Sequence, residues 1–280
     1  MKSVFTKYPN TSKYILAVVL FFLALFVSGF IDTPFLKRYF PYVSIILLIT
    51  VTWILFKTDN ESLNVLGFNL SIRNLLFLPL GIIIGAVAFL LVKYLRALYT
   101  GEVFELTTSE INYNALLYGL YTLLPTVAIE EFLFRGYLFK KTIEVSNVVI
   151  ANVVFGIIFM LVHILDRTIL QNIPMIVFLG ITIPIGHLLF ATALLKSKTI
   201  YFPIGLHLGN NWATIHLISN LNDGSSIFFI PESVRFETWS SFITLIIIWN
   251  TFYVLIILLI GKWDKVSTFL GLNQLINMKK

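Results

Sequence analysis

The sequence contains no cysteine and little charge. Only 12% of its 280 residues are charged, against about a quarter in an ordinary soluble domain. The lack of cysteine excludes a disulfide framework, a thiolate nucleophile and a thiolate metal site. The lack of charge excludes an ordinary soluble domain. Instead, 58% of the residues are hydrophobic and the mean hydropathy is +0.90, which is typical of an integral membrane protein.

Eight apolar stretches have the length of a membrane span, for which a helix needs about 20 residues. Irregular backbone cannot face lipid, and the alternating pattern of a porin-like barrel is missing. We therefore predict an all-α membrane protein, a polytopic bundle of about eight transmembrane helices. The stretches cover residues 14–31, 40–57, 74–99, 113–141, 147–165, 171–195, 199–221 and 240–262.

Lysines and arginines are distributed unevenly between the two sides of this predicted bundle. With the N-terminus inside, 14 of them fall on the inner side and six on the outer side. The positive-inside rule therefore predicts that both termini of this multi-pass protein are cytoplasmic. The single-domain form and the isoleucine- and asparagine-rich composition indicate a bacterial cell membrane. The net charge of +6 is assigned to these loops rather than to nucleic-acid binding. The first stretch ends in "SGFIDTPF", a poor signal-peptide cleavage site, so we expect a retained helix.

Ionisable side chains cluster inside the apolar stretches in the middle of the chain. Intramembrane ionisable residues usually face a protein interior or a water-filled cavity, and they indicate a functional site. We therefore predict an intramembrane polar cavity. Its candidate residues are Glu130, Glu131, Arg135, His163, His187, His207, Asn211 and His216.

Spacing assigns different positions to these groups. Glu131 and Arg135 are four residues apart, so they share a helix face and can form an ion pair. Glu130 points about 100° away from Glu131 and can face the cavity. His207 and Asn211 are also four apart. Glu130 and His207 lie at similar depths, about 14 to 16 Å from the inner ends of their helices.

The depth of His163 and the roles of nearby residues are less well determined by the pattern. His163 matches the depth of Glu130 only if its helix begins near Asn152, and lies deeper if the helix begins at Asn147. We interpret Asp166 as the start of a loop. His187 and His216 are interpreted as packing residues. The glycines of "GLHLGNN" suit helix packing and also suit the close approach of an extended peptide.

The candidate groups suit hydrolysis of an amide bond. A buried glutamate with a nearby histidine can activate water and return the proton to a leaving amine. A histidine and an amide can donate hydrogen bonds to a developing oxyanion. Two histidines and a glutamate also form a known zinc set. The residues alone leave both mechanisms open.

Three short motifs occur in order on successive stretches. They are "EEFLFR" (EExxxR), "FMLVH" (FxxxH) and "HLGNN" (HxxxN). Over about residues 115 to 220 the chain resembles the CAAX-processing and bacteriocin-processing (CPBP/Abi) family of intramembrane proteases, which includes the type II CAAX prenyl endopeptidases. The resemblance implies that residues 113–221 form the catalytic core. Residues 1–112 then hold about three helices and an interfacial segment near 58–73, and residues 222–280 a loop, the last helix and a basic tail.

The resemblance also implies residue roles. Glu130 and His163 become the water-activating pair, and His207 and Asn211 the oxyanion-stabilising pair. Glu131 and Arg135 become a supporting ion pair. No cofactor is certain, and a divalent metal such as zinc, held by Glu130, His163 and His207, stays open.

The predicted function is that of an intramembrane endopeptidase. Its substrate would be a membrane-associated, prenylated or leader peptide or protein, reached from the membrane or the inner face. One alternative is a non-catalytic regulator or bacteriocin self-immunity protein of the same fold. A second is a proton-coupled transporter, although the internal repeats of many transporters are not evident in the sequence. Oligomeric state is left open.

Overall fold

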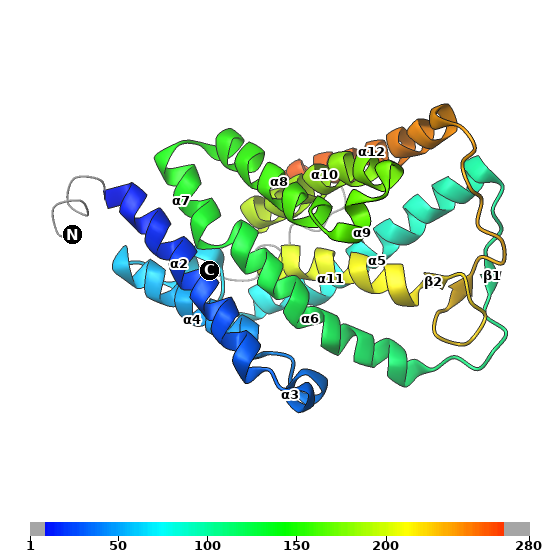
Figure 1. Cartoon of the computed structure of the whole chain (residues 1–280). Helices are drawn as coiled ribbons and strands as arrows, with labels where there is room; N and C mark the ends of the chain where they lie inside the picture. Colours follow the sequence, from blue (N-terminus) through cyan, green and yellow to red (C-terminus); the bar gives the residue numbers. More distant parts are fainter. Residues whose placement is uncertain (1–8, 266–280) are drawn as a thin grey trace.

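The computed structural model describes residues 9–265 as a helical bundle, which confirms the predicted all-α fold (Figure 1). Each of the eight predicted stretches contains a helix. The helices are α2 (Pro9–Ile31), α3 (Pro34–Tyr39), α4 (Val43–Thr58), α5 (Ile72–Thr100), α6 (Tyr113–Arg135), α7 (Tyr137–Val145), α8 (Val148–Ile164), α9 (Arg167–Leu170), α10 (Ile173–Ser197), α11 (Tyr201–His216) and α12 (Trp239–Gly261).

Fewer of these helices than predicted have full spanning length. In the described part of the chain, five are long and apolar enough to cross a membrane: α2, α5, α6 with α7, α10 and α12. Helices α4 and α11 have 16 residues each and α8 has 17. At 1.5 Å per residue these reach only about 24 to 26 Å, short of the roughly 30 Å hydrocarbon layer. The apolar composition of a stretch therefore overstated the length of its helix.

The predicted span 113–141 is broken near its end. Helix α6 ends at Arg135 and α7 begins at Tyr137. Gly136 lies between them with φ −81° and ψ −135°, outside the helical region. A Cβ atom at this position would lie 2.1 Å from the carbonyl oxygen of Phe132, so the bend requires glycine.

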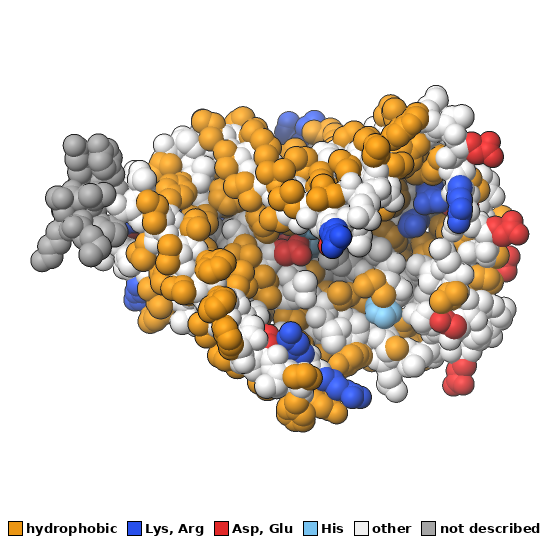
Figure 2. All heavy atoms as spheres, in the orientation of Figure 1, with side chains coloured by type: hydrophobic (Ala, Val, Ile, Leu, Met, Phe, Trp, Pro, Cys, Tyr) orange, Lys and Arg blue, Asp and Glu red, His pale blue; other side chains and the backbone are white. Residues whose placement is uncertain are grey.

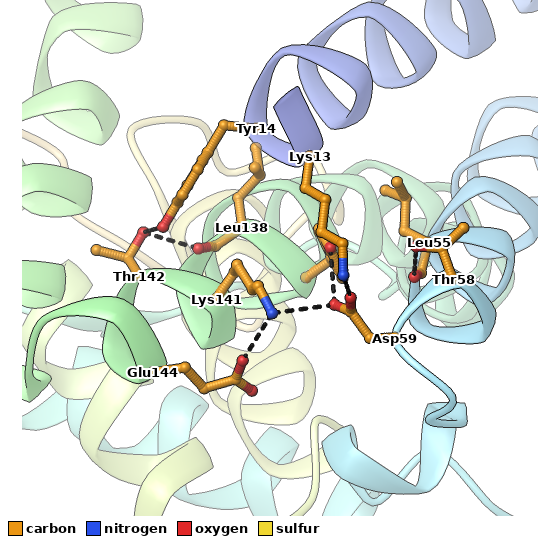
Figure 3. A network of polar contacts seen from close by, with 10 residues as sticks. Lys13, Tyr14, Leu55, Thr58, Asp59, Leu138, Lys141, Thr142 and Glu144 are labelled. Carbon is orange, nitrogen blue, oxygen red and sulfur yellow. Dashed lines mark hydrogen bonds and ion pairs between the residues drawn. The ribbon is translucent and has the colours of Figure 1, made fainter. Parts of the chain in front are cut away.

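The ends of the bundle differ in their polar contacts. At one end, which we call the Asp59 end, the carboxylate of Asp59 after α4 accepts hydrogen bonds from Lys13 on α2 and from Tyr137 and Lys141 on α7 (Figure 3). Burial alone would raise the pKa of the Asp59 carboxyl, but these hydrogen bonds outweigh burial and hold the pKa below its usual 3.8. Three helices are thereby tied together at this end.

The connection from α4 to α5 also lies at the Asp59 end. The predicted interfacial segment near 58–73 contains only a short 3₁₀ helix, η1 (Leu63–Leu66). Its last carbonyl, that of Leu66, accepts a 2.8 Å hydrogen bond from the backbone of Ile200, between α10 and α11. This contact packs the segment against the rest of the protein, and its interfacial location stays a prediction.

The opposite end, which we call the sheet end, carries a small sheet that the sequence analysis did not predict. Strand β3 (Phe228–Phe229) lies between β1 (Glu105–Leu106), with which it is antiparallel, and β2 (Ile218–Ser219), with which it is parallel. Each strand has two residues, too few to show an alternating pattern. Figure 2 shows charged side chains gathered at this end and hydrophobic side chains over the helices, as expected of a surface in lipid.

Helices α5 and α11 pack closely through glycines on both. A Cβ atom at Gly85 would lie 2.2 Å from the carbonyl oxygen of Leu206, and one at Gly205 would lie 2.3 Å from that of Leu78. Small residues let membrane helices approach in this way. Gly205 and Gly209 face α5, so the packing interpretation of the "GLHLGNN" glycines is confirmed. Their surfaces are not free to receive an extended peptide.

Candidate active site

A cavity of about 1220 Å³ lies between α5, α6, α8, α10, α11 and α12. Glu130, His163, His207 and Asn211 all line it, although they come from three helices far apart in the sequence. The structure therefore brings all four predicted catalytic residues to one hollow. Its volume exceeds the roughly 300 to 1000 Å³ of most small-molecule sites, so it has room for a segment of peptide.

His207 lies between the two adjacent carboxylates of α6. Its Nδ1 atom is 2.9 Å from Oε1 of Glu131 and its Nε2 atom is 3.7 Å from Oε2 of Glu130. The first contact is a hydrogen bond in which Nδ1–H donates to the carboxylate. The second is too long for a hydrogen bond but within ion-pair range, and it leaves room for a bridging oxygen.

Glu131 and Arg135 form the ion pair that their spacing indicates. Nη1 of Arg135 lies 3.2 Å from Oε1 of Glu131, and both side chains are fully buried. The guanidinium lies over the Phe159 ring at 4.2 Å and over the Phe190 ring at 5.2 Å. These cation–π contacts help to offset the cost of burying the arginine.

Glu130 differs from Glu131 in its surroundings. Its side chain is 26% exposed and lines the cavity, whereas that of Glu131 is fully buried. In the described structure the Oε2 atom of each glutamate has no hydrogen-bond partner. Glu131 pairs with Arg135, and the ion-pair contact of Glu130 within residues 9–265 is with His207. Of the two carboxylates, Glu130 is therefore the one that a cavity water or a substrate can reach.

His163 lines the same cavity but makes a different contact from the predicted one. Its Nδ1 donates a 2.7 Å hydrogen bond to the carbonyl oxygen of Phe159, one turn earlier on α8. A carbonyl only accepts, so this bond places the proton of a neutral ring on Nδ1 and leaves Nε2 as an acceptor. Within residues 9–265, His163 has no hydrogen bond or ion pair with Glu130, so their pairing stays a prediction.

The position of His163 follows from where its helix begins. Asn147 caps the N-terminus of α8, with its side chain accepting from the backbone of Ile150 at 2.9 Å. The helix thus begins at Val148, the case in which His163 lies deeper. The rings of His163 and His207 lie 4.6 and 6.3 Å from that of Phe159, so the two histidines are no more than about 11 Å apart.

Aromatic rings hold the site in place, a role that the sequence analysis did not assign. Phe190 stacks on His207 with ring centroids 4.5 Å apart and an interplanar angle of 17°. Phe159 contacts Arg135, His163 and His207. The first position of the FxxxH motif was a signal for Phe159, whereas Phe190 belongs to no motif.

Asn211 lines the cavity, and its neighbour Asn210 also does so. The side-chain amide of Asn210 donates a 2.6 Å hydrogen bond to the hydroxyl of Tyr253 on α12. That contact fixes Asn210 and leaves the amide of Asn211, one turn from His207, as the available donor. Sequence analysis missed Asn210 because it is not part of the HxxxN motif.

The arrangement does not assemble the zinc set considered from the sequence. Residues 9–265 contain no group of three or more His, Asp or Glu side chains placed to bind one metal ion. Glu130 and His207 approach each other, but His163 directs Nδ1 to the Phe159 carbonyl. These three residues therefore do not form a metal site in this conformation.

The remaining polar candidates pack against other side chains or cap a helix. His187 is fully buried against Phe139, and neither ring nitrogen has a partner in the described structure. His216 packs on Trp212 and contacts the backbone of Ser225. Asp166 caps the short helix α9, which confirms the loop interpretation. The hydrogen bonds from Thr168 and Ile169 lower the pKa of its exposed carboxyl.

The cavity extends along the bundle from the catalytic candidates to the sheet end. Its lining runs on α10 from Phe190 to Pro174, about 24 Å of helix. At the sheet end it is bordered by Arg96 and by residues 234–239. Near its deep end lie the buried side chains of Glu131, Arg135 and His187, which contact the lining residues His207, Phe190 and Phe159, respectively. The site is thus the deep end of a long cavity.

Together these features define a class: a helical integral membrane protein whose acid, imidazole and amide groups meet in a cavity within the bundle. Residues 112–213 match the family model described as "Type II CAAX prenyl endopeptidase Rce1-like". This segment contains all three motifs and is similar to Rce1-like domains, which confirms the resemblance to the CAAX-type intramembrane proteases. No curated protein and no solved structure matches the chain.

Proposed function

We propose that the protein is an intramembrane endopeptidase that hydrolyses a peptide bond at the deep end of the cavity. The observation that carries the proposal is the position of His207, in contact with Glu131 and facing Glu130. Two adjacent carboxylates thereby receive different tasks. The Rce1-like match over the same residues supports this reading.

Glu130 is the general base. Its unpartnered, buried Oε2 atom borders the cavity, where it can accept a proton from a water molecule. The water then attacks the carbonyl carbon of the scissile bond, and the proton passes from Glu130 to the leaving amine. This double use of one carboxyl group needs no other proton carrier.

His207 and Asn211 stabilise the oxyanion of the tetrahedral intermediate. Glu131 accepts the Nδ1–H of His207 and so orients the ring; when the ring carries a second proton, its Nε2–H points toward the space beside Glu130. The Asn211 amide, one turn away, supplies a second donor. A donor of this kind contributes about 10²- to 10³-fold in rate.

His163 acts through its Nε2 atom. With Nδ1–H donated to Phe159, Nε2 can accept a hydrogen bond from the attacking water and orient it toward the substrate. His163 thus assists Glu130 through a water molecule, at a separation that allows no direct contact in this conformation. The water-activating pair of Glu130 and His163, which the family resemblance implies, would therefore act through a water molecule between the two side chains.

The substrate reaches the site through the sheet end of the cavity or laterally between the helices that line it. With both termini inside, the sheet end faces outside. Access from the inner face, as the sequence analysis considered, does not fit this orientation. Orientation and side of access must therefore be measured together.

The first experiment identifies the substrate. Peptides from cell membranes containing the wild-type protein or Glu130→Ala are mapped by mass spectrometry, and fragments lost in the variant mark candidate cleavage sites. Synthetic peptides spanning those sites are then incubated with purified protein. We expect Glu130→Ala and His163→Ala to lower the cleavage rate at least about 10²-fold, and Glu144→Gln, exposed on α7, to leave it unchanged.

The same variants separate the alternatives. If both site variants cut as well as the wild type, the endopeptidase proposal fails. A regulator or immunity protein would instead keep its cellular effect in a Glu130→Gln variant. A proton-coupled transporter would show substrate counterflow in liposomes that Glu130→Gln abolishes.

A further inference from the structure

One lysine in the described part of the cavity wall makes no ion pair. Lys93 lies on the membrane-spanning helix α5, seven residues before its end, and lines the cavity. It has no hydrogen bond or ion pair with any of residues 9–265; its ammonium lies 5.6 Å from the centroid of the Phe89 ring. An unpaired charge on a spanning helix is costly, and such residues that face a cavity mark sites of function.

The other cations of the cavity wall differ from Lys93. Arg96 makes a bidentate ion pair with the buried carboxylate of Glu102, at 2.9 and 2.6 Å. The same carboxylate accepts the backbone N–H of Val234 at 2.9 Å, so Arg96 and Glu102 hold the rim segment in place. Arg235 is exposed on that rim. Lys93 is thus the half-buried cation of the described cavity wall that makes no hydrogen bond or ion pair.

The close packing of α5 against α11 gives the level of Lys93 relative to the site. Gly81 faces Phe202 to Leu206, and Gly85 faces Leu206 to Asn210. His207 therefore lies level with about residue 83 of α5, and Lys93 lies about ten residues further toward the sheet end. Ten helical residues correspond to about 15 Å. An extended peptide covers that distance in about four or five residues.

We propose that Lys93 binds a carboxylate of the substrate peptide, about four or five residues from the scissile bond, and so sets the position of cleavage. This inference rests on the proposed endopeptidase function and adds a specificity-determining residue to it. A free C-terminal carboxylate and an Asp or Glu side chain share the required chemistry. A carboxylate in the half-buried wall would turn a costly lone charge into a charge-assisted pair.

The test uses full-length protein in lipid nanodiscs and a synthetic peptide set. Each peptide from the mapped cleavage sites is made with a free-acid or an amidated C-terminus, and with Asp or Asn at the fourth and fifth positions from the scissile bond. Wild type, Lys93→Gln and Lys93→Arg are compared. Lys37→Gln is the matched control, because Lys37 is an exposed lysine at the same end and does not line the cavity.

We expect the wild type to prefer one carboxylate-bearing form at least about tenfold in kcat/KM. Lys93→Gln should lose that preference while cutting the neutral form at the wild-type rate, and Lys93→Arg should keep it. The free-acid and Asp arms show which carboxylate is bound. Equal loss on charged and neutral peptides, or no loss, overturns the proposal.

A binding measurement keeps the two proposals distinguishable. If the wild type cuts no peptide, the endopeptidase proposal fails, and free-acid and amidated peptides are compared for binding to the Glu130→Gln protein with and without Lys93→Gln. Tighter binding of the free-acid peptide only when Lys93 is present supports the proposal that Lys93 binds a carboxylate. Equal binding of the free-acid and amidated peptides overturns it. Native mass spectrometry showing that Lys93→Gln releases an anionic phospholipid, with no peptide effect, would also overturn it.

Discussion

The imidazole of His207 donates its Nδ1–H to Glu131 across a 2.9 Å contact that joins α11 to α6. The same carboxylate oxygen accepts from Arg135 at 3.2 Å. Glu131 therefore holds two cation-forming groups in the bundle interior, whereas Glu130, its neighbour in the chain, is left to the cavity. Adjacent residues of the same type thus have separable effects on stability and on catalysis.

Replacing each glutamate by glutamine should show that separation. Glu130→Gln should abolish cleavage and leave the melting temperature within a degree or so of wild type, because Glu130 is partly exposed and pairs weakly. Glu131→Gln, in contrast, should lower the melting temperature by several degrees. It leaves Arg135 as a buried charge without its counterion, and breaking a buried pair costs roughly 3 to 5 kcal/mol.

Thermal unfolding in detergent and peptide cleavage are measured on the same preparations. Lys37→Gln serves as a charge-removal control, because Lys37 is exposed and does not line the cavity. An unchanged melting temperature for Glu131→Gln would contradict its assignment as the structural carboxylate. Equal destabilisation by both substitutions would contradict the difference between the two residues.

A second prediction concerns the close contact between α5 and α11. A Cβ atom at Gly209 would lie 2.1 Å from the carbonyl oxygen of Ile82, and one at Gly205 would lie 2.3 Å from that of Leu78. Gly205→Ala should therefore push the helices apart and carry His207 away from Glu130. Gly29 on α2 has no atom within 4 Å of an added Cβ, so Gly29→Ala is the control.

Gly205→Ala should lower both the melting temperature and the cleavage rate, since overpacking typically costs about 1 to 3 kcal/mol. Gly29→Ala should leave both unchanged. Wild-type behaviour of Gly205→Ala would mean that the helices are further apart than the structure shows. A loss in Gly29→Ala as well would point to a general intolerance of added volume.

The sequence predicted the elements of the site better than their contacts. Helical spacing correctly paired Glu131 with Arg135 and turned Glu130 toward a cavity, because both facts depend on one helix only. The partner of each histidine depends on how separate helices tilt and where each begins. The α8 start at Val148 and the contact of His207 with Glu131 are of that kind, and spacing along the chain does not determine them.

Two further features could not be predicted from the sequence pattern, for similar reasons. In the sequence, the segment around Gly136 reads as part of one continuous apolar stretch. Only the position of the Phe132 carbonyl in the structure shows why the helix ends there. Lys93 lies inside the predicted stretch 74–99, yet it was counted among the outer charges. Hydropathy does not tell which face of a helix lines a cavity, so the place of Lys93 in the cavity wall depends on how α5 packs in the bundle.

A third prediction follows from the Asp59 cluster at the opposite end from the cavity mouth. The folded-state pKa of Asp59 lies below its usual 3.8, so its hydrogen bonds stabilise the fold fully above that value. The contribution is lost as pH falls through the lowered folded-state pKa. Asp59→Asn should therefore be less stable than wild type at pH of about 5 to 7, and the difference should shrink in acid.

Melting temperatures of wild type and Asp59→Asn are compared in one detergent over a pH series. Glu144→Gln is the control, because Glu144 contacts Lys141 but is exposed at the same end. A stability difference that is constant down to pH of about 2.5 would show that the asparagine acts through shape and not through charge. A larger effect of Glu144→Gln would place the important ion pair elsewhere.

The last prediction concerns orientation, and the absence of cysteine makes it directly measurable. Glu144 is exposed on α7 at the Asp59 end, and Glu232 is exposed before α12 at the sheet end. The lysines and arginines in the loops favour the Asp59 end as the inner side. Lys2, Lys7, Lys279 and Lys280, which were part of that count, lie outside the described residues.

We therefore expect a membrane-impermeant maleimide to label Glu232→Cys in intact cells and to label Glu144→Cys only after the membrane is opened. The cysteine-free wild type is the background control. That result would place the cavity mouth on the outer side and exclude entry from the cytoplasm through it. The reverse labelling would show that acidic loops at the sheet end face inward, and a peptide could then reach Glu130 from the cytoplasm, along the same cavity and past Lys93.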